Sequence, residues 1–319
     1  MKSLLNVENL NTRIFTKKTV VNVACDIDLT IGAGEIFGII GESGCGKTLS
    51  MLSLTKLIPP SAQITSGHIY LNGEAIELNN EKYLQKVRGS QISYIFQDPS
   101  ASLNPLFSVG QQIQEVFLTH KKMNKNNSKK ESLKLLELVG LKPEKIYYDY
   151  YPHQLSGGMN QRAMIAMAIA SKPKLLIADE PTSSLDRITE LKILNLLLDL
   201  NKKFGLTIIL ITHNISLIQD FAHRVAIMYA GRIVETGLKN EVINNPKHPY
   251  TKALLECIPQ NRSKEKLLNT IKGNVPNLSQ LPKGCKFHPR CQYVMDKCLK
   301  DEPTFTNLKG EHSVKCYLW

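Results

Sequence analysis

Apolar positions along the chain predict an α/β core. Residues 4–7, 21–31 and 35–40 have the composition of strands, and the third leads directly into a glycine-rich loop. A helix is predicted from 47 to 57, where two consecutive prolines end it. Another strand follows at 91–96. Strands that alternate with helices in this way are typical of an α/β protein.

The pattern becomes helical in the middle of the chain, from about residue 103 to 170, where apolar residues recur at the 3.6-residue spacing of helices. The individual helices are predicted at 109–120, 131–139 and 158–170. Strands return at 174–178, 206–212 and 224–229, with a helix at 190–203 between the first two. Because core strands flank the helical segment on both sides, we predict one α/β domain with a helical insert.

The last part of the chain differs from the rest. Proline-containing sequence at 245–250 interrupts the pattern, and a single helix is predicted at 250–257. Residues 259–319 are rich in Pro, Lys, Asn and Cys. We predict that they form a loop-rich appendage, and we find no internal repeat.

Composition limits the kind of protein. The 319 residues include 42% apolar residues, enough for a normal core. No long apolar stretch follows the first five residues, so they do not resemble a signal peptide. No segment approaches the roughly 18 consecutive apolar residues of a membrane span. The sequence therefore predicts a soluble, cytosolic chain.

The formal net charge is +12, which is compatible with nucleic acid, anionic lipid or phosphate ligands. The densest basic block, at residues 121–130, is predicted to be a solvated loop between helices. No aromatic residues interleave with it, which weakens a nucleic-acid interpretation.

A complete phosphate-binding loop follows the strand at 35–40 and opens the next helix. It consists of Gly41, Glu42, Ser43, Gly44, Cys45, Gly46, Lys47 and Thr48. Glycines let backbone N–H groups converge on phosphate oxygens. Lys47 is expected to reach the β- and γ-phosphates, and the Thr48 hydroxyl to bind Mg²⁺. A chance match is the alternative, which the flanking strand and helix disfavour.

Two carboxylates follow the predicted strand at 174–178. Asp179 is placed to hold Mg²⁺ through water, and Glu180 is placed to polarise the attacking water. A strand end capped by acidic residues is the alternative when this segment is taken alone.

Five further residues, at three places in the sequence, fit a nucleotide site. Ser156, Gly157 and Gly158 begin a helix, where a hydroxyl and free N–H groups form an anion site; an ordinary N-cap is the alternative. Gln97 ends one strand, and His213 ends another. A lone histidine after a strand is usually structural, but here it could contact a γ-phosphate.

These motifs, in this order, resemble those of the ATP-binding subunit of an ABC transporter. The Walker A motif is at 41–48, the signature motif at 155–161 and the Walker B motif at 175–180. Gln97 stands in the Q-loop and Asp186 in the D-loop, and His213 follows the predicted strand at 206–212. The resemblance implies a P-loop ATPase core, a cassette domain at 1–240 and a helical subdomain at about 98–170.

The resemblance also implies roles for single residues. Glu180, His213 and Gln97 would act in catalysis, and Thr48, Gln97 and Asp179 would hold Mg²⁺ with ATP. The loop at 41–48, residues 156–158 and Asp186 would contact nucleotide. Phe15 is the candidate for stacking on adenine.

Longer segments are similar to the oligopeptide and dipeptide importer subfamily, which includes nickel importers. They are residues 96–105, 151–159, 248–251 and 284–291. Members carry a C-terminal extension, here expected at 241–319. The chain departs from the subfamily at Asn160, where Arg is usual, at Ser183 and Ser184, where Thr-Ala is usual, and at Lys286, where Pro is usual. None of these changes removes a phosphate, Mg²⁺ or water contact.

Partners and location follow from the resemblance. Two ATPase subunits, often different chains, would face head to tail, so that Ser156 and Gly158 of one complete the ATP site of the other. Two membrane permeases and an extracytoplasmic substrate-binding protein would complete the importer, with this chain on the cytoplasmic face of the membrane. The transported compound would be a peptide or, alternatively, nickel or a metal–metallophore complex.

Other classes of ABC ATPase fit less well. Chromosome and repair ATPases split the cassette with long coiled coils, and ribosome-associated ones carry two cassettes, features that this sequence lacks. An exporter ATPase would not have the segment at 284–291. Nucleic acid is therefore not an expected partner.

Four cysteines cluster near the end of the chain: Cys285, Cys291, Cys298 and Cys316. In a cytosolic protein such a cluster favours metal over disulfides. The spacing, with 5, 6 and 17 residues between them, is neither that of a zinc ribbon nor that of a ferredoxin. The resemblance implies a [4Fe-4S] cluster, and zinc and free thiols remain alternatives.

Overall fold

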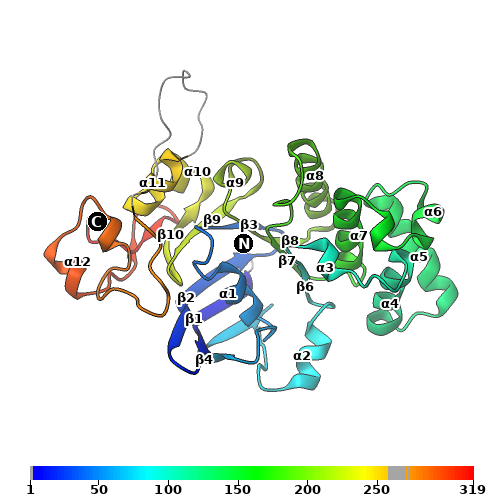
Figure 1. Ribbon diagram of the computed structural model, residues 1–319, viewed down its shortest axis with the longest axis horizontal. Coiled ribbons are helices and arrows are strands. Elements are labelled where there is room, and N and C mark those ends of the chain that lie inside the picture. Colours follow the sequence, from blue (N-terminus) through cyan, green and yellow to red (C-terminus); the bar gives the residue numbers. More distant parts are fainter. Residues whose placement is uncertain (1–2, 258–270, 272) are drawn as a thin grey trace. The chain divides into compact units, whose positions relative to one another are not determined.

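The computed structural model describes residues 3–257, 271 and 273–319 (Figure 1). The chain divides into two compact units. Unit 1 consists of Met1–Ile76 and Ile211–Trp319, and unit 2 of Glu77–Leu210. Each unit is described by itself below.

Unit 1 contains an antiparallel sheet formed near the N-terminus. Its strands lie in the order β2-β1-β4-β5. They are β1 (Ser3–Phe15), β2 (Val20–Gly32), β4 (Ala62–Leu71) and β5 (Glu74–Ala75). Leu5, Leu10, Ile27 and Ile31 are buried, as expected for one apolar face of a sheet. The register between β1 and β2 shifts after Val7, as in a β-bulge.

A second run of strands in unit 1 carries the site and the end of the chain. Its order is β11-β12-β10-β9-β3. The strands are β3 (Ile36–Ile40), β9 (Arg224–Tyr229), β10 (Arg232–Leu238), β11 (Thr306–Asn307) and β12 (Ser313–Val314). β3 pairs with β9 in parallel and is entirely buried, whereas β12 pairs antiparallel with β10. The C-terminal appendage thus adds two short strands beside β10.

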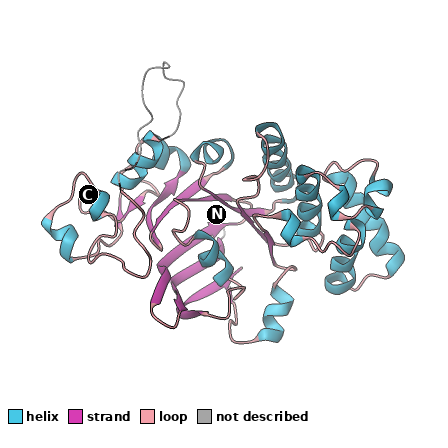
Figure 2. Cartoon of the chain, viewed as in Figure 1, coloured by secondary structure: helices cyan, strands magenta, loops and turns pink. Residues whose placement is uncertain are grey.

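The helices of unit 1 are short (Figure 2). They are α1 (Lys47–Ser53), α9 (Ile215–Phe221), α10 (Lys239–Asn244), α11 (Pro249–Glu256), the 3-10 helix η2 (His288–Arg290) and α12 (Asp296–Lys300). The helix predicted at 47–57 is too long, because α1 tightens after Ser53. There the N–H groups of Leu54 and Lys56 donate to carbonyls three residues earlier, and Lys56 has a φ of 54°.

Unit 2 is mainly helical. Its helices are α2 (Glu81–Val87), α3 (Pro99–Ser102), α4 (Val109–Lys121), α5 (Lys125–Leu138), α6 (Glu144–Asp149), the 3-10 helix η1 (Pro152–Gln154), α7 (Gly157–Ile169) and α8 (Arg187–Phe204). Its strands are β6 (Ile92–Ile95) and β7 (Leu175–Asp179), which pair in parallel. β8 (Thr207–Thr212) neighbours β7 and crosses the boundary between the units.

The prediction of a loop across residues 121–130 is wrong for most of that block. α5 begins at Lys125, because the Asn124 side chain accepts a hydrogen bond from Asn127 N–H and caps the helix. Lys125, Lys129 and Lys130 are exposed on that helix. The block is solvated as predicted, but charge alone did not distinguish a loop from the first turns of a polar helix.

Candidate nucleotide-binding site

The phosphate-binding loop of unit 1 runs from β3 into α1. Two of its glycines are required by close backbone packing. A Cβ on Gly41 would lie 2.2 Å from Met228 O, and a Cβ on Gly46 would lie 2.3 Å from Val23 O. Gly46 also has a φ of 105°, a region that favours glycine. β9 and β2 therefore hold the loop closely from both of its ends.

Lys47 lies within the loop. Its side chain is buried, and Nζ donates to Gly41 O at 2.8 Å and to Glu42 O at 3.0 Å. Loop carbonyls thus satisfy an ammonium that would otherwise be costly to bury. Ser43, Gly44 and Thr48 are exposed. The Lys47 ammonium can therefore exchange its bonds to the loop carbonyls for bonds to phosphate oxygens. The exposed residues of the loop leave room for those phosphates.

Cys45 occupies a variable position of the loop and is fully buried. Burial raises the pKa of its thiol above the usual value, and nearby Lys47 opposes that rise. Cys45 is therefore a small apolar side chain under the loop, and its backbone N–H donates to Glu42 O at 3.3 Å.

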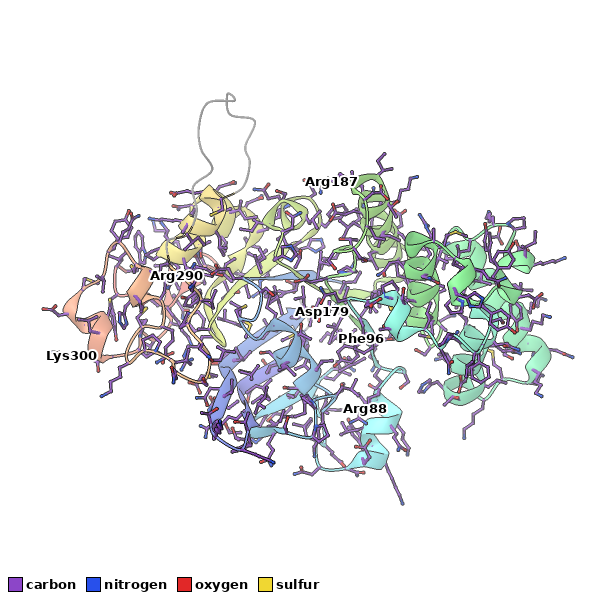
Figure 3. The ribbon with its side chains drawn as sticks, viewed as in Figure 1. Arg88, Phe96, Asp179, Arg187, Arg290 and Lys300 are labelled. Atoms are coloured by element: carbon purple, nitrogen blue, oxygen red, sulfur yellow. The ribbon has the colours of Figure 1, made fainter. Side chains whose placement is uncertain are left out.

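The two carboxylates predicted for catalysis lie in unit 2, at the end of β7 (Figure 3). Every residue of β7 is buried, and its last residue, Asp179, is 8% exposed. Glu180 follows with a φ of 45°, which is uncommon for a residue other than glycine and turns the chain away from the strand. Gln97 Nε2 donates to Glu180 Oε2 at 3.4 Å. The structure therefore brings together Gln97 and Glu180, which are far apart in sequence.

Ser156 and Asp186, also in unit 2, are helix caps. Ser156 Oγ accepts from Met159 N–H at 3.4 Å at the start of α7. Asp186 Oδ1 accepts from the N–H groups of Ile188 and Thr189, each at 3.0 Å, at the start of α8. Hydrogen bonds from Thr189, followed by that from Ile188, lower the pKa of Asp186. The N-cap interpretation of Ser156 is thus correct locally, and a role toward nucleotide stays a prediction.

Gly158 lies close to α8. A Cβ at this position would be 2.5 Å from Thr189 Cγ2, so packing inside unit 2 is one reason for a glycine here. Gly157 and Ser156 are exposed at the start of α7. Both residues are therefore accessible at a helix N-terminus, where anions bind favourably.

The remaining predicted residues lie in unit 1. His213 is exposed directly after β8, and Phe15 ends β1 with 41% of its side chain exposed. The predicted site residues therefore divide between the units. The loop at 41–48, Phe15 and His213 belong to unit 1, and Gln97, Ser156, Gly157, Gly158, Asp179, Glu180 and Asp186 to unit 2. That they form one site stays a prediction.

The four C-terminal cysteines line one small cavity in unit 1. Cys285, Cys291, Cys298 and Cys316 all border it, and its volume is about 10 Å³, room for roughly one water. Burial raises the pKa of Cys285 to about 11 and also raises those of Cys291 and Cys316. Among the described residues, no three His, Cys, Asp or Glu side chains are arranged to hold a metal ion. The predicted iron–sulfur or zinc site therefore gains no support beyond this shared cavity.

One residue near the site was not expected from sequence. Arg290, in η2, forms a bidentate ion pair with Glu42 of the phosphate-binding loop, with N–O distances of 2.7 and 3.1 Å. The two residues are 248 positions apart, and nothing in either local sequence signals the contact. None of the helices in the described part of the chain has the length and apolar character of a membrane span.

Two family models of known proteins match this sequence. Residues 24–183 match the family model described as ABC transporter. Residues 234–298 match the model described as oligopeptide/dipeptide transporter, C-terminal region.

Relatives match over the whole chain. The oligopeptide transport ATP-binding protein AppD of Bacillus subtilis is 41% identical over 100% of this chain and 98% of its own length. The dipeptide transport ATP-binding protein DppD of Escherichia coli is 40% identical over 99% of this chain and 96% of its own.

Among solved structures, the ABC cassette MJ0796, in a dimer bound to ADP and Pi, has a TM-score of 0.67 at 26% identity. It covers 74% of this chain and 99% of the cassette. CbiO1 of Clostridium perfringens, part of an ABC transporter complex, has a TM-score of 0.67 at 29% identity, over 77% of this chain and 92% of CbiO1. With the fold, the motifs and the family model in agreement, the chain belongs to the ABC transporter family, as an ATP-hydrolysing subunit with a P-loop ATPase fold.

Proposed function

We propose that this chain powers an ABC importer of dipeptides and oligopeptides. The observation that carries the proposal is the full-length similarity to peptide-transport ATP-binding proteins, including the C-terminal region that has its own peptide-transporter model. The cassette would span residues 1–240, with its helical subdomain at about 98–170, and the C-terminal extension would span 241–319.

In the proposed mechanism, binding of ATP draws Lys47 from the loop carbonyls to the β- and γ-phosphates. Thr48 and Asp179 supply hydroxyl and carboxylate oxygens of the kind that Mg²⁺ prefers. Glu180, oriented by the hydrogen bond from Gln97, polarises the attacking water, and His213 contacts the γ-phosphate.

The proposed assembly contains a second ATPase subunit, two permeases and an extracytoplasmic substrate-binding protein, with this chain on the cytoplasmic face of the membrane. Ser156 and Gly158 of one ATPase complete the nucleotide site of the other. Dimer closure on ATP and opening after hydrolysis would drive the permeases between their two access states. The exposed start of α7 supports this arrangement, because Ser156 and Gly157 are accessible to a partner.

The proposed base is tested by Glu180→Gln in the assembled complex. We expect ATP binding to persist and turnover to fall by about 10²–10³-fold, the range seen when one electrostatic contact is removed. Steady-state hydrolysis and equilibrium binding of a fluorescent ATP analogue measure the two effects. Unchanged turnover would rule out Glu180 as the base.

The proposed substrate is tested by uptake. Cells with the wild-type chain or the Glu180→Gln variant would be given a labelled tripeptide or radioactive nickel. We expect Glu180→Gln to abolish uptake of the peptide and to leave uptake of nickel unchanged. Loss of nickel uptake instead would identify the alternative metal importer.

Co-purification of partners with the tagged chain tests the transporter proposal itself. Recovery of ribosomes or DNA-repair proteins without permeases would contradict it.

We also propose that the four C-terminal cysteines hold a [4Fe-4S] cluster, with zinc as the alternative. Its support is that all four thiols border one cavity, and a small loop-rich segment gains stability from a metal that ties its loops together. The cavity of about 10 Å³ is too small for a cluster as it stands, so the loops would have to move apart to admit one. Anaerobic reconstitution with iron and sulfide is expected to give broad visible absorbance, and Cys298→Ser to lower it. Colourless protein that contains zinc would favour the alternative.

A further inference from the structure

Glu42, the second residue of the phosphate-binding loop, is held at three separate points. Its N–H donates to Tyr250 Oη at 3.0 Å, and its carbonyl accepts from Lys47 Nζ at 3.0 Å and from Cys45 N–H at 3.3 Å. Its carboxylate accepts two N–H groups of the Arg290 guanidinium. Tyr250 and Arg290 both lie beyond residue 240, so the C-terminal extension binds two of these three groups, the N–H and the carboxylate.

Arg290 is firmly built into the extension (Figure 3). Its side chain is 4% exposed, and its guanidinium carbon lies 5.9 Å from the centre of the Tyr229 ring. Tyr229 packs against Tyr250 and Phe287, with ring centres 4.6 and 5.2 Å apart. A planar guanidinium held in this way is suited to bidentate recognition of a carboxylate and loses little further freedom in the pair.

The backbone around Arg290 is continuous with the cysteine lobe, defined here as residues 284–319. His288 N–H donates to Cys285 O at 3.1 Å, and Cys291 N–H donates to His288 O at 3.2 Å. Cys285 N–H in turn donates to Cys298 O at 2.9 Å. The position of the guanidinium therefore follows the fold of the lobe.

We propose that Arg290 is a positioning residue of the nucleotide site, through which the C-terminal extension sets the affinity of this subunit for ATP. It fixes the second residue of the phosphate-binding loop and compensates the charge of the Glu42 carboxylate. The inference rests on ATP binding at this loop and deepens the proposed function.

Charge gives the expected direction. The Glu42 side chain is 26% exposed, and its backbone lies in the loop that receives a polyanion. Removal of Arg290 leaves a carboxylate without its ion-pair partner beside the incoming phosphates, where like charges repel. The same change frees the loop backbone at one of its fixed points. Both effects weaken ATP binding, and neither acts on the water-activating Glu180.

The test is the KM for ATP, the kcat and the dissociation constant of a fluorescent ATP analogue, measured on the complete transporter complex. For Arg290→Ala we expect KM and the dissociation constant to rise about tenfold, within the usual range for coupled sites, and kcat to change less than twofold. Arg290→Lys, which keeps the charge without the bidentate geometry, is expected to lie between the wild type and Arg290→Ala.

Two further variants separate charge from loss of folding. In Glu42→Gln/Arg290→Ala the unpaired carboxylate is absent, and affinity is expected to return to within about threefold of Glu42→Gln alone. Arg232→Ala is the matched control, because it breaks the Arg232–Glu302 ion pair between β10 and the lobe without touching the loop. We expect it to leave KM unchanged.

The outcomes are distinct. Equal rises in KM for Arg290→Ala and Arg232→Ala, with equal losses of thermal stability, would show a purely structural role and overturn the inference. Unchanged KM in a folded Arg290→Ala complex would overturn it as well. A wild-type complex that neither binds nor hydrolyses ATP would refute the proposed function itself.

Discussion

The phosphate-binding loop and the cysteine lobe lie in the same unit but are held in different ways. The loop joins a fully buried strand to a helix, and two glycines fit it against neighbouring backbone. The lobe contains only very short elements in its described residues, such as η2 and α12. It depends on side-chain contacts, among them the buried pair of His312 Nε2 with Glu235 Oε1 at 2.7 Å. Close packing against two buried neighbouring strands thus distinguishes the loop, whereas separate hydrogen bonds of backbone and side chains hold the lobe.

The largest effect is expected where backbone packing is closest. Gly41→Ala would place a methyl group 2.2 Å from Met228 O, and the rigid strand cannot yield as a side chain would. We expect the free energy of unfolding to fall by about 3 kcal/mol or more and ATP binding to be lost. Denaturant titration and nucleotide binding measure the two losses.

The matched control for that substitution lies in the same loop. A Cβ on Gly44 would meet no described atom within 4 Å, although its φ is 77°. Gly44→Ala is expected to cost about 1 kcal/mol, from backbone conformation alone. Equal losses for the two variants would show that close packing is not what distinguishes the loop.

An effect that is small for each pH unit but accumulates is expected from acid. Burial lowers the pKa of His248 to about 3, below its ordinary value of 6.5, so the folded chain holds this residue neutral. Unfolding then takes up a proton below pH 6.5, and stability falls as pH decreases from 6.5 toward 3, by at most about 1.4 kcal/mol per pH unit.

His248→Asn isolates that contribution. His248 Nδ1 accepts from Tyr250 N–H and caps α11, and an asparagine oxygen can serve as the same cap without titrating. The difference in unfolding free energy between the wild type and the variant, measured across pH 7 to pH 4, is expected to change with pH. A constant difference would contradict a buried neutral histidine.

The smallest effect on the whole protein is expected in the lobe. A Cβ on Gly284 would lie 2.3 Å from Cys298 O, at a φ of 62°. Because the described elements of the lobe are very short, we expect Gly284→Ala to open it locally, with faster amide exchange at 284–319 and a change of less than about 1 kcal/mol in global unfolding. A loss as large as that of Gly41→Ala would show that lobe and core unfold together.

Elements with strong local signals were predicted well from sequence. The strand, loop and start of the helix around residues 36–47 are confirmed, and α7, β7 and α11 are confirmed to within one residue at each end. Continuous apolar runs and capping residues specify these elements locally. β4 was missed, because few of its residues are buried and its sequence, which includes Gly67 and His68, does not alternate clearly.

The candidate site was predictable as a set of motifs but not as a set of contacts. Spacing identified Glu180 and Gln97, and their hydrogen bond required the fold of unit 2. Glu42 and Arg290 form an ion pair although they are 248 residues apart, and neither charged residue is marked by its local sequence as having a partner. Tertiary structure alone creates that contact, so no local pattern could reveal it.

The position of β12 has a consequence for any shortened form of this protein. Val314 and Ser313 pair with Glu235 and Thr236 of β10, and Lys315 N–H donates to Val234 O at 2.8 Å. Chain termination at residue 240 would leave these backbone groups of β10 as an open sheet edge, a template on which strands of other molecules add. The last residues of the chain therefore cover this edge of β10 and leave only the two-residue strand β11 as the outer strand there.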